Sequence, residues 1–131
     1  MFSSPQVILF SEHVQRTVGF YLGLGFSESF RVPATGEPIH VDVVLGGYQI
    51  GIASVASVRD DHGLDPVASG QRAGVVLRIE DVRACYADLI AAGAPEFKPP
   101  SEWLGRLLIA WTADPDGNPV QLVQHLKKPP S

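Results

Sequence analysis

The sequence feature that most constrains the fold is an internal repeat with a period of about 68 residues. A shift of this length places Val7-Ile8-Leu9 on Val75-Val76-Leu77. Towards the end of each half the shift grows to about 70, and it places Ile50-Gly51-Ile52 on Val120-Gln121-Leu122. Each half contains an apolar run, a segment with helical spacing of apolar residues, and three further apolar runs. We therefore predict an α+β fold made of two βαβββ modules.

The repeat also predicts how the chain is divided. The modules span residues 5–56 and 72–126 of a single domain, and the polar segment 57–71 is either a linker between them or a loop over a pocket. Neither module could bury both its helix and one sheet face alone, so the two sheets must share a core or enclose a space. The alternative is an ordinary α+β domain in which the similarity of the halves is coincidental.

Composition excludes several classes of protein. The formal net charge is −4 and the isoelectric point is about 5.4, which argues against a nucleic-acid partner because such proteins present a clustered positive surface. No apolar run approaches the roughly 20 residues needed to span a bilayer. The single cysteine, Cys85, allows no intrachain disulfide and suits a reducing compartment. We therefore expect a soluble, cytoplasmic protein with no nucleic-acid or membrane partner.

The segment D-P-D-G-N-P-V-Q-L, from Asp114 to Leu122, predicts a β-hairpin near the end of the chain. Asp-Pro and Asp-Gly favour turns, and apolar runs at Leu107–Trp111 and Val120–Val123 flank them. This hairpin, the segment Val18–Phe26 and the repeat together resemble the vicinal-oxygen-chelate superfamily of glyoxalases, bleomycin-resistance proteins and extradiol dioxygenases. The resemblance implies two βαβββ modules that curl into a half-open barrel around a ligand, and it implies a homodimer.

The resemblance also implies where a metal would bind. Metal enzymes of the superfamily carry one ligand on the first and one on the last strand of each module, and these positions hold Gln6, Gly51, Gly74 and Gln121. Glycine has no side-chain donor, and a glutamine amide is a weak partner for a divalent cation unless carboxylates or imidazoles accompany it. We therefore expect no metal and no cofactor.

Alternation of side chains along each strand predicts the wall of a cavity. If Gln6 and Gly74 face a ligand, the residues two and four places further along the same strands do so too. These residues are Ile8, Phe10, Val76 and Arg78. Trp111 also matches a position that in the dioxygenases points an aromatic ring into the active site, with core packing as the alternative. An exposed strand end is the alternative for Arg78, and Trp103 is predicted at a loop tip as a ligand or dimer contact. The predicted ligand-binding residues are Gln6, Ile8, Phe10, Val76, Arg78, Trp103, Ile109, Trp111 and Gln121.

No catalytic set is recognisable in the sequence. A shift of about 70 aligns His40 with Ala110, one position out of phase with the residues predicted to face the cavity. Cys85 lies on the second predicted helix, at a position that favours the core. We therefore predict no catalytic residue and locate no general base.

These observations favour a small-molecule-binding protein of the bleomycin-resistance type, which sequesters a planar or aromatic compound without a metal centre. Whether it is an enzyme stays open. The alternative is a metal-dependent glyoxalase-like lyase or isomerase, or an extradiol-type dioxygenase, with ligands that the sequence does not reveal. A third possibility is an enzyme without metal, in which Arg78 or a histidine polarises a carbonyl group.

Overall fold

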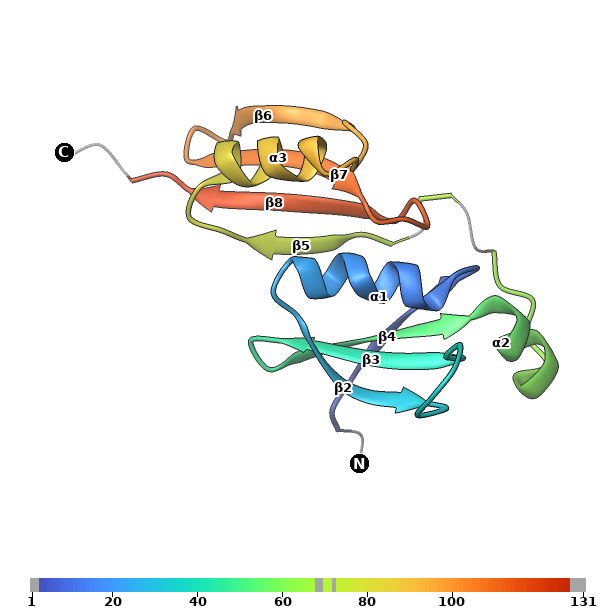
Figure 1. The fold of residues 1–131 in the computed structure, drawn as a ribbon. Coiled ribbons are helices and arrows are strands. Elements are labelled where there is room, and N and C mark those ends of the chain that lie inside the picture. Colours follow the sequence, from blue (N-terminus) through green and yellow to red (C-terminus); the bar gives the residue numbers. More distant parts are fainter. Residues whose placement is uncertain (1–2, 68–69, 72, 128–131) are drawn as a thin grey trace. The chain divides into compact units, whose positions relative to one another are not determined.

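The computed structural model describes residues 3–67, 70–71 and 73–127. The chain divides into two compact units, Met1–Ser69 (unit 1) and Gly70–Ser131 (unit 2), and each is described by itself (Figure 1). Among the described residues no helix is both long and apolar enough to cross a membrane.

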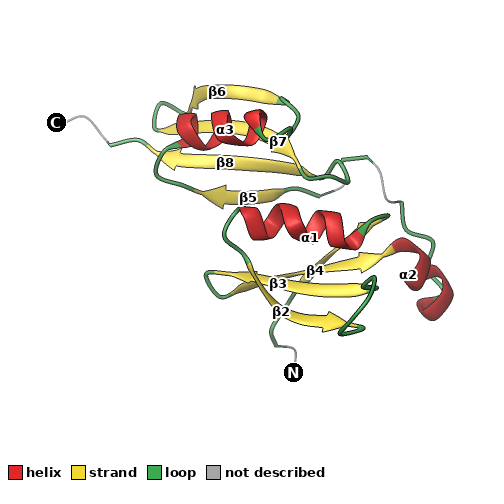
Figure 2. Cartoon of the chain, in the orientation of Figure 1, coloured by secondary structure: helices red, strands yellow, loops and turns green. Residues whose placement is uncertain are grey.

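Unit 1 is a four-stranded sheet with a helix on one of its faces (Figure 2). The strand order is β1-β4-β3-β2, with β1 parallel to β4 and the other neighbours antiparallel. Its elements in chain order are β1 (Val7–Ser11), α1 (Val14–Gly23), β2 (Ser27–Val32), β3 (His40–Leu45), β4 (Tyr48–Ser54) and α2 (Val55–His62).

Helix α1 packs on β3 and β4 through a narrow apolar stripe. Val14, Val18 and Tyr21 recur at helical spacing, and all three are buried. Full burial of one such apolar side chain contributes about 1.5–3 kcal/mol, so the stripe is sufficient to hold the helix on the sheet. The strand residues buried beneath it are Val41, Val43 and Ile52.

Unit 2 repeats this arrangement. The strand order is β5-β8-β7-β6, again with one parallel pair, β5 with β8. Helix α3 is capped at its N-terminus by Asp81, whose Oδ1 accepts a hydrogen bond from the backbone N–H of Ala84 at 3.1 Å. The elements are β5 (Val75–Arg78), α3 (Val82–Ala91), β6 (Lys98–Trp103), β7 (Leu107–Ala113) and β8 (Pro119–His125). The predicted α+β fold with two βαβββ modules is confirmed.

The predicted hairpin at Asp114 is also present, and the aspartate itself holds the turn. Its Oδ1 accepts hydrogen bonds from the backbone N–H groups of Asp116 and Asn118, and its Oδ2 accepts one from Nδ2 of Asn118, each at 2.9 Å. Gly117 has a φ of +87°, a conformation that glycine adopts without steric cost. The side chain of Asp114 is buried, so these bonds satisfy a carboxylate that is shielded from water.

The polar segment predicted as a linker is helical at its start. Helix α2 is capped by Ser54, whose Oγ accepts a hydrogen bond from the N–H of Ser57, and it ends at Gly63 with a φ of +69°. Val55 and Val58 are buried. Only these two apolar residues mark the buried side, which explains why the periodicity of the sequence did not reveal the helix. Residues 68 and 69 of the predicted linker lie outside the described part of the chain.

Candidate functional site

Each sheet has one face covered by a helix and one face that its own helix leaves uncovered, here called the open face. In unit 1 the covered face carries the buried valines of β3, so the alternate residues His40 and Asp42 lie on the open face. The cross-strand register then gives one row across the sheet. That row consists of Ile8 on β1, Gly51 on β4, Asp42 on β3 and Phe30 on β2.

A chain of hydrogen bonds runs over the open face of unit 1 and ends at Asp42. Ser29 Oγ donates to Gln49 Oε1 at 2.9 Å, and Gln49 Nε2 donates to Gln6 Oε1 at 2.9 Å. Gln6 Nε2 then donates to Asp42 Oδ1 at 2.7 Å. The same Oδ1 lies 2.7 Å from Nε2 of His40.

Gly51 provides the space for this arrangement. A Cβ atom at this position would lie 2.7 Å from Gln6 Nε2, 3.1 Å from Asp42 Oδ1 and 3.1 Å from Ile8 Cγ1. The amide of Gln6 therefore reaches Asp42 through the volume that a side chain at residue 51 would occupy.

The prediction that His40 is out of phase with the cavity-facing residues is wrong. Asp42 pairs with Gly51, and Trp111 pairs with Gln121, so Asp42 is the counterpart of Trp111 and His40 is the counterpart of Ile109. The shift between the repeats changes at the hairpin turns. The turn in unit 1 has two residues between Leu45 and Tyr48, whereas the turn in unit 2 has one residue more between Asp114 and Asn118. A single shift applied to both strands of the hairpin therefore misplaces β3 by one residue.

The open face of unit 2 has an aromatic centre where unit 1 has a carboxylate. Trp111 pairs with Gln121 on β8 and with Lys98 on β6. Its ring reaches towards the start of β5, where Cζ3 lies 3.6 Å from the position of a Cβ atom on Gly74. A hollow of about 650 Å³ opens beside it. The lining of this hollow includes Gln71, Gly74, Glu96, Phe97, Lys98, Trp111 and Pro119.

The other predicted site residues are distributed over several places. Gln6 lines a separate hollow of about 790 Å³ in unit 1, together with Tyr48 and Gln49. Arg78 is exposed at the end of β5 and lines a third hollow, of about 480 Å³, with Glu80. The remaining predicted residues were assigned to the open face by strand alternation, and their exposure differs. Ile8 and Val76 are exposed, Phe10 and Gln121 are half-buried, and Ile109 is buried.

Trp103 lies at the end of β6, next to the turn that leads into β7. It pairs with Leu107, and the following residue, Leu104, has a φ of +58°. The side chains of Trp103 and Leu104 are 51% and 62% exposed. The tip of this hairpin is therefore an exposed apolar surface, separate from the hollow beside Trp111.

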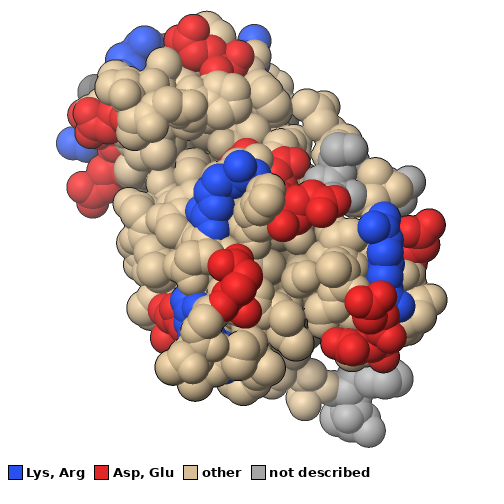
Figure 3. Space-filling model, turned by 45° about the vertical axis from the view of Figure 1, so that its right-hand side comes forward, with Lys and Arg blue, Asp and Glu red and all other residues tan. Residues whose placement is uncertain are grey.

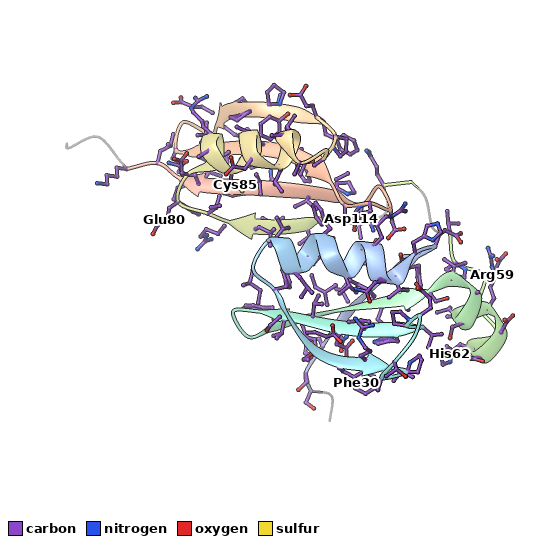
Figure 4. All side chains as sticks on the ribbon, in the orientation of Figure 1. Phe30, Arg59, His62, Glu80, Cys85 and Asp114 are labelled. Carbon is purple, nitrogen blue, oxygen red and sulfur yellow. The ribbon has the colours of Figure 1, made fainter. Side chains whose placement is uncertain are left out.

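Sequence reasoning missed the pair His40 and Asp42, although the sequence contains a signal for it. The two residues stand two apart on one strand, and such residues share a face. Identifying that face needed the pairing of β3 with β4, which the sequence repeat placed one residue out of register. Figure 4 labels Phe30, the cross-strand partner of Asp42, which lies on the side of the sheet away from α1.

The four positions that hold metal ligands in related enzymes do not fit a divalent cation here. The Gln6 amide donates to Asp42, Gly51 and Gly74 have no side chain, and the ring of Trp111 passes close to Gly74. A catalytic metal site uses about three protein ligands. Over the described ranges no three His, Cys, Asp or Glu side chains gather in such a way. The donor chemistry of these positions therefore suits hydrogen bonding better than metal coordination.

Charge is mixed over the surface. On the face shown in Figure 3, the Lys and Arg side chains lie among Asp and Glu side chains and form no extended basic surface. On the sheet of unit 1, Arg31 forms an ion pair with Glu28, and among the described residues this is the one ion pair of that sheet with an arginine. Guanidinium and carboxylate therefore partly neutralise each other along β2.

Two βαβββ units, each an open four-stranded sheet with a helix on it, define the vicinal-oxygen-chelate fold. The chain belongs to the Glyoxalase/Bleomycin resistance protein/Dioxygenase superfamily, whose family model matches residues 3–122. No curated protein matches the chain.

Solved structures share the fold at low sequence identity. A glyoxalase/bleomycin resistance protein/dioxygenase from Nocardioides is 20% identical, with a TM-score of 0.76 over 100% of this chain and 89% of that one. A family enzyme from Burkholderia phytofirmans PsJN is 21% identical, with a TM-score of 0.78 over 95% and 100% of the two chains. A lactoylglutathione lyase from Agrobacterium tumefaciens is 18% identical, with a TM-score of 0.71 over 95% and 94%. At these identities the likeness establishes the fold alone.

Proposed function

We propose that this chain binds a planar or aromatic small molecule in the hollow beside Trp111, without a metal ion, in the manner of a bleomycin-resistance-type protein. The observation that carries the proposal is the approach of the Trp111 ring to the place that a side chain at Gly74 would occupy. The missing side chain at residue 74 leaves one region of the ring open, and a hollow of about 650 Å³ lies there. Small-molecule sites commonly have volumes of about 300–1,000 Å³.

The lining of this hollow suits a flat ligand with a few polar groups. Trp111 is half-buried, so its ring is held in place while part of it stays accessible for stacking. Phe97 and Pro119 add apolar surface. Glu96, Lys98 and Gln71 supply a carboxylate, an ammonium group and an amide that could orient the ligand.

The experiment that tests this proposal is a titration with 8-anilinonaphthalene-1-sulfonate, read by the fluorescence of this probe itself so that neither tryptophan is needed as the reporter, followed by its displacement with planar drug-like compounds. Trp111→Ala should weaken binding tenfold or more, because truncating an aromatic side chain that anchors a bound partner costs about 2 kcal/mol or more and each tenfold in affinity corresponds to about 1.4 kcal/mol. Trp103→Ala is the matched control and should leave affinity unchanged. Equal affinities of the wild type and Trp111→Ala, with the fold intact, would show that the ligand does not bind in the hollow beside Trp111.

The rival function is a metal enzyme, and it is tested by thermal unfolding. Protein stripped with a chelator is supplied in turn with nickel, zinc, manganese, iron and cobalt. A metal that binds only the folded state stabilises it by about 4 kcal/mol at a thousandfold excess over its dissociation constant. A clear rise in melting temperature with one metal would contradict the metal-free proposal.

We also propose that the protein forms a homodimer, with the exposed tip of the β6–β7 hairpin as one contact. Trp103 and Leu104 form an apolar surface there, and large exposed apolar surfaces commonly mark interfaces. Sedimentation of the wild type and of Trp103→Ser tests this. A monomeric wild type would end the proposal, and a dimer unaffected by the substitution would move the interface elsewhere.

A further inference from the structure

The pair of His40 and Asp42 on the open face of unit 1 has a geometry that the binding proposal does not use. Nε2 of His40 lies 2.7 Å from Oδ1 of Asp42. The side chains are 29% and 14% exposed, so both are largely shielded while the imidazole stays accessible. A histidine held by a carboxylate is the arrangement in which an imidazole acts as a base, because the carboxylate orients the ring and stabilises its protonated form.

The hydrogen bonds around Asp42 determine which ring nitrogen carries the proton. An ionised carboxylate only accepts hydrogen bonds, so Gln6 must present its Nε2 to Asp42 and keep its Oε1 for Gln49. Gln49 in turn uses its Oε1 to accept from Ser29. Every donor along this chain therefore points towards Asp42. For the same reason the neutral ring of His40 carries its proton on Nε2.

Nδ1 of His40 is then the basic nitrogen of the pair. Among the described residues, none donates a hydrogen bond to it. A general base must be within hydrogen-bond reach of the proton that it removes. The lone pair of Nδ1 thus accepts no hydrogen bond from the described residues, and it belongs to a side chain that is 29% exposed.

The surroundings of the pair favour a flat, partly apolar molecule. The ring of Phe30 lies 6.2 Å from that of His40, centroid to centroid, and its side chain is 51% exposed. Ile8 is in the same cross-strand row as Asp42 and is also exposed. Gly51, between Ile8 and Asp42 in that row, adds no side chain of its own.

We propose that His40 is a general base that removes a proton from a carbon acid, a planar molecule with a C–H bond next to a carbonyl group or in an electron-poor heteroaromatic ring. In this step the C–H bond breaks, its electron pair moves into the conjugated system, and the proton is transferred to Nδ1 of His40. Asp42 is a positioning residue that stabilises the resulting imidazolium. Return of the same proton to another atom of the molecule completes an isomerisation that needs no metal and no co-reactant. The proposal concerns unit 1 and does not depend on the binding site in unit 2.

The first test is the protonation state of the ring, measured by nitrogen-detected NMR at neutral pH. In the neutral form of the ring we expect the proton on Nε2 and a bare Nδ1, and a hydrogen-bonded Nε2–H signal that exchanges with solvent much faster in Asp42→Asn. A ring protonated on Nδ1 would overturn the proposal, because no basic nitrogen would face a ligand. This measurement separates positioning by Asp42 from a purely structural role, which melting temperature alone would not do.

The second test is catalysis of a generic carbon-acid reaction, the ring opening of 5-nitrobenzisoxazole. A base removes the proton at C3, the C–H electron pair becomes the third bond of a nitrile, and the N–O bond breaks to leave a phenolate that is followed by its absorbance. His40→Gln should lower the second-order rate constant by at least about tenfold, below the roughly 10²- to 10⁴-fold that a positioned base gives its own substrate. Asp42→Asn should give an intermediate loss.

Two controls make the result specific. His62→Gln removes another histidine of unit 1, exposed on α2, and should leave the rate unchanged. Addition of a chelator should also leave it unchanged. Equal rate constants for the wild type and His40→Gln would overturn the proposal, and so would a rate that the chelator abolishes, since that would assign the pair to a metal.

Discussion

The Cβ position of Gly51 lies 2.7 Å from Nε2 of Gln6, closer than any real Cβ contact. Residues 6 and 51 are two of the four positions at which related enzymes hold a metal. Here the side chain of Gln6 occupies the space that a side chain at residue 51 would fill. Gln6 extends over Gly51 to donate to Asp42. At these two positions the sheet of unit 1 thus supports a hydrogen bond to a carboxylate.

Gly51→Ala should therefore break the hydrogen bond between Gln6 and Asp42 while leaving the fold intact. The new methyl group meets the flexible end of Gln6, which moves away easily. We expect a net loss of about 1 kcal/mol in the free energy of unfolding, because a hydrogen bond to a charged group contributes about 1.5–3 kcal/mol and replacing a strand glycine returns about 0.5–1. Denaturant unfolding measures this change.

The matched control for Gly51→Ala is Gly19→Ala on helix α1. A Cβ atom at residue 19 would meet no other atom within 4 Å. The control should stabilise the protein by about 0.5–1 kcal/mol, since alanine replaces glycine within a helix. If both substitutions stabilise equally, the hydrogen bond between Gln6 and Asp42 contributes nothing.

Asp114→Ala should be the most destabilising single substitution in the β7–β8 turn. It leaves the N–H groups of Asp116 and Asn118 without their shared acceptor. We expect a loss of about 2–3 kcal/mol in the free energy of unfolding, because each unsatisfied shielded group costs about 1–3 kcal/mol and water reaches part of the turn. Asp60→Ala, which removes an exposed carboxylate from α2, should change stability by less than about 0.5 kcal/mol. A similar effect of the two substitutions would contradict the role of Asp114.

The ion pair of Glu28 and Arg31 should make stability weakly dependent on acid pH. The hydrogen bond from Arg31 holds the pKa of Glu28 below its ordinary value of 4.5. A lowered pKa means that the pair stabilises the folded state above the ordinary pKa and that this contribution is lost as pH falls through the lowered one. Because solvent and salt screen the charges of this surface pair, we expect the contribution to be small.

Glu28→Gln tests that contribution by thermal unfolding over a pH series. The melting temperature of the variant should fall slightly below that of the wild type at neutral pH, and the two should converge at acid pH. Glu102→Gln, an exposed carboxylate in unit 2, should show no such difference. A gap between Glu28→Gln and the wild type that persists at low pH would point to lost packing instead of lost charge.

Cys85 should react slowly with thiol reagents. Burial raises the pKa of its thiol, and the nearby carboxylates of Asp88 and Asp81 add to the rise. The thiolate is the reactive form, so less of it is present at mildly alkaline pH than in free cysteine. Alkylation by iodoacetamide, followed by mass spectrometry, should be slower than for the unfolded chain and somewhat faster in Asp88→Asn. A rate equal to that of the unfolded chain would contradict the burial of this thiol.

Local sequence alone determined much of this structure. Alternating and helical spacing of apolar residues predicted the order of strands and helices, and turn-forming residues predicted the hairpin at Asp114. These features depend on neighbours along the chain, so they can be recognised without knowing any tertiary contact. Helix α2 is the exception, because its two buried valines leave almost no periodic signal.

The open faces were determined only by how the strands pair. Asp42 and His40 could be placed on the open face only once β3 was paired with β4, and one additional residue in the second hairpin was enough to misalign them in the sequence repeat. The contact of Gln6 with Asp42 joins residues 36 positions apart, and the approach of Trp111 to Gly74 brings β7 next to the residue that precedes β5. The sequence by itself determined which elements form and in what order, because local propensity and periodicity act over a few residues. Only the tertiary structure decided which side chains meet, because cross-strand register and the space left by a glycine are properties of the assembled sheet.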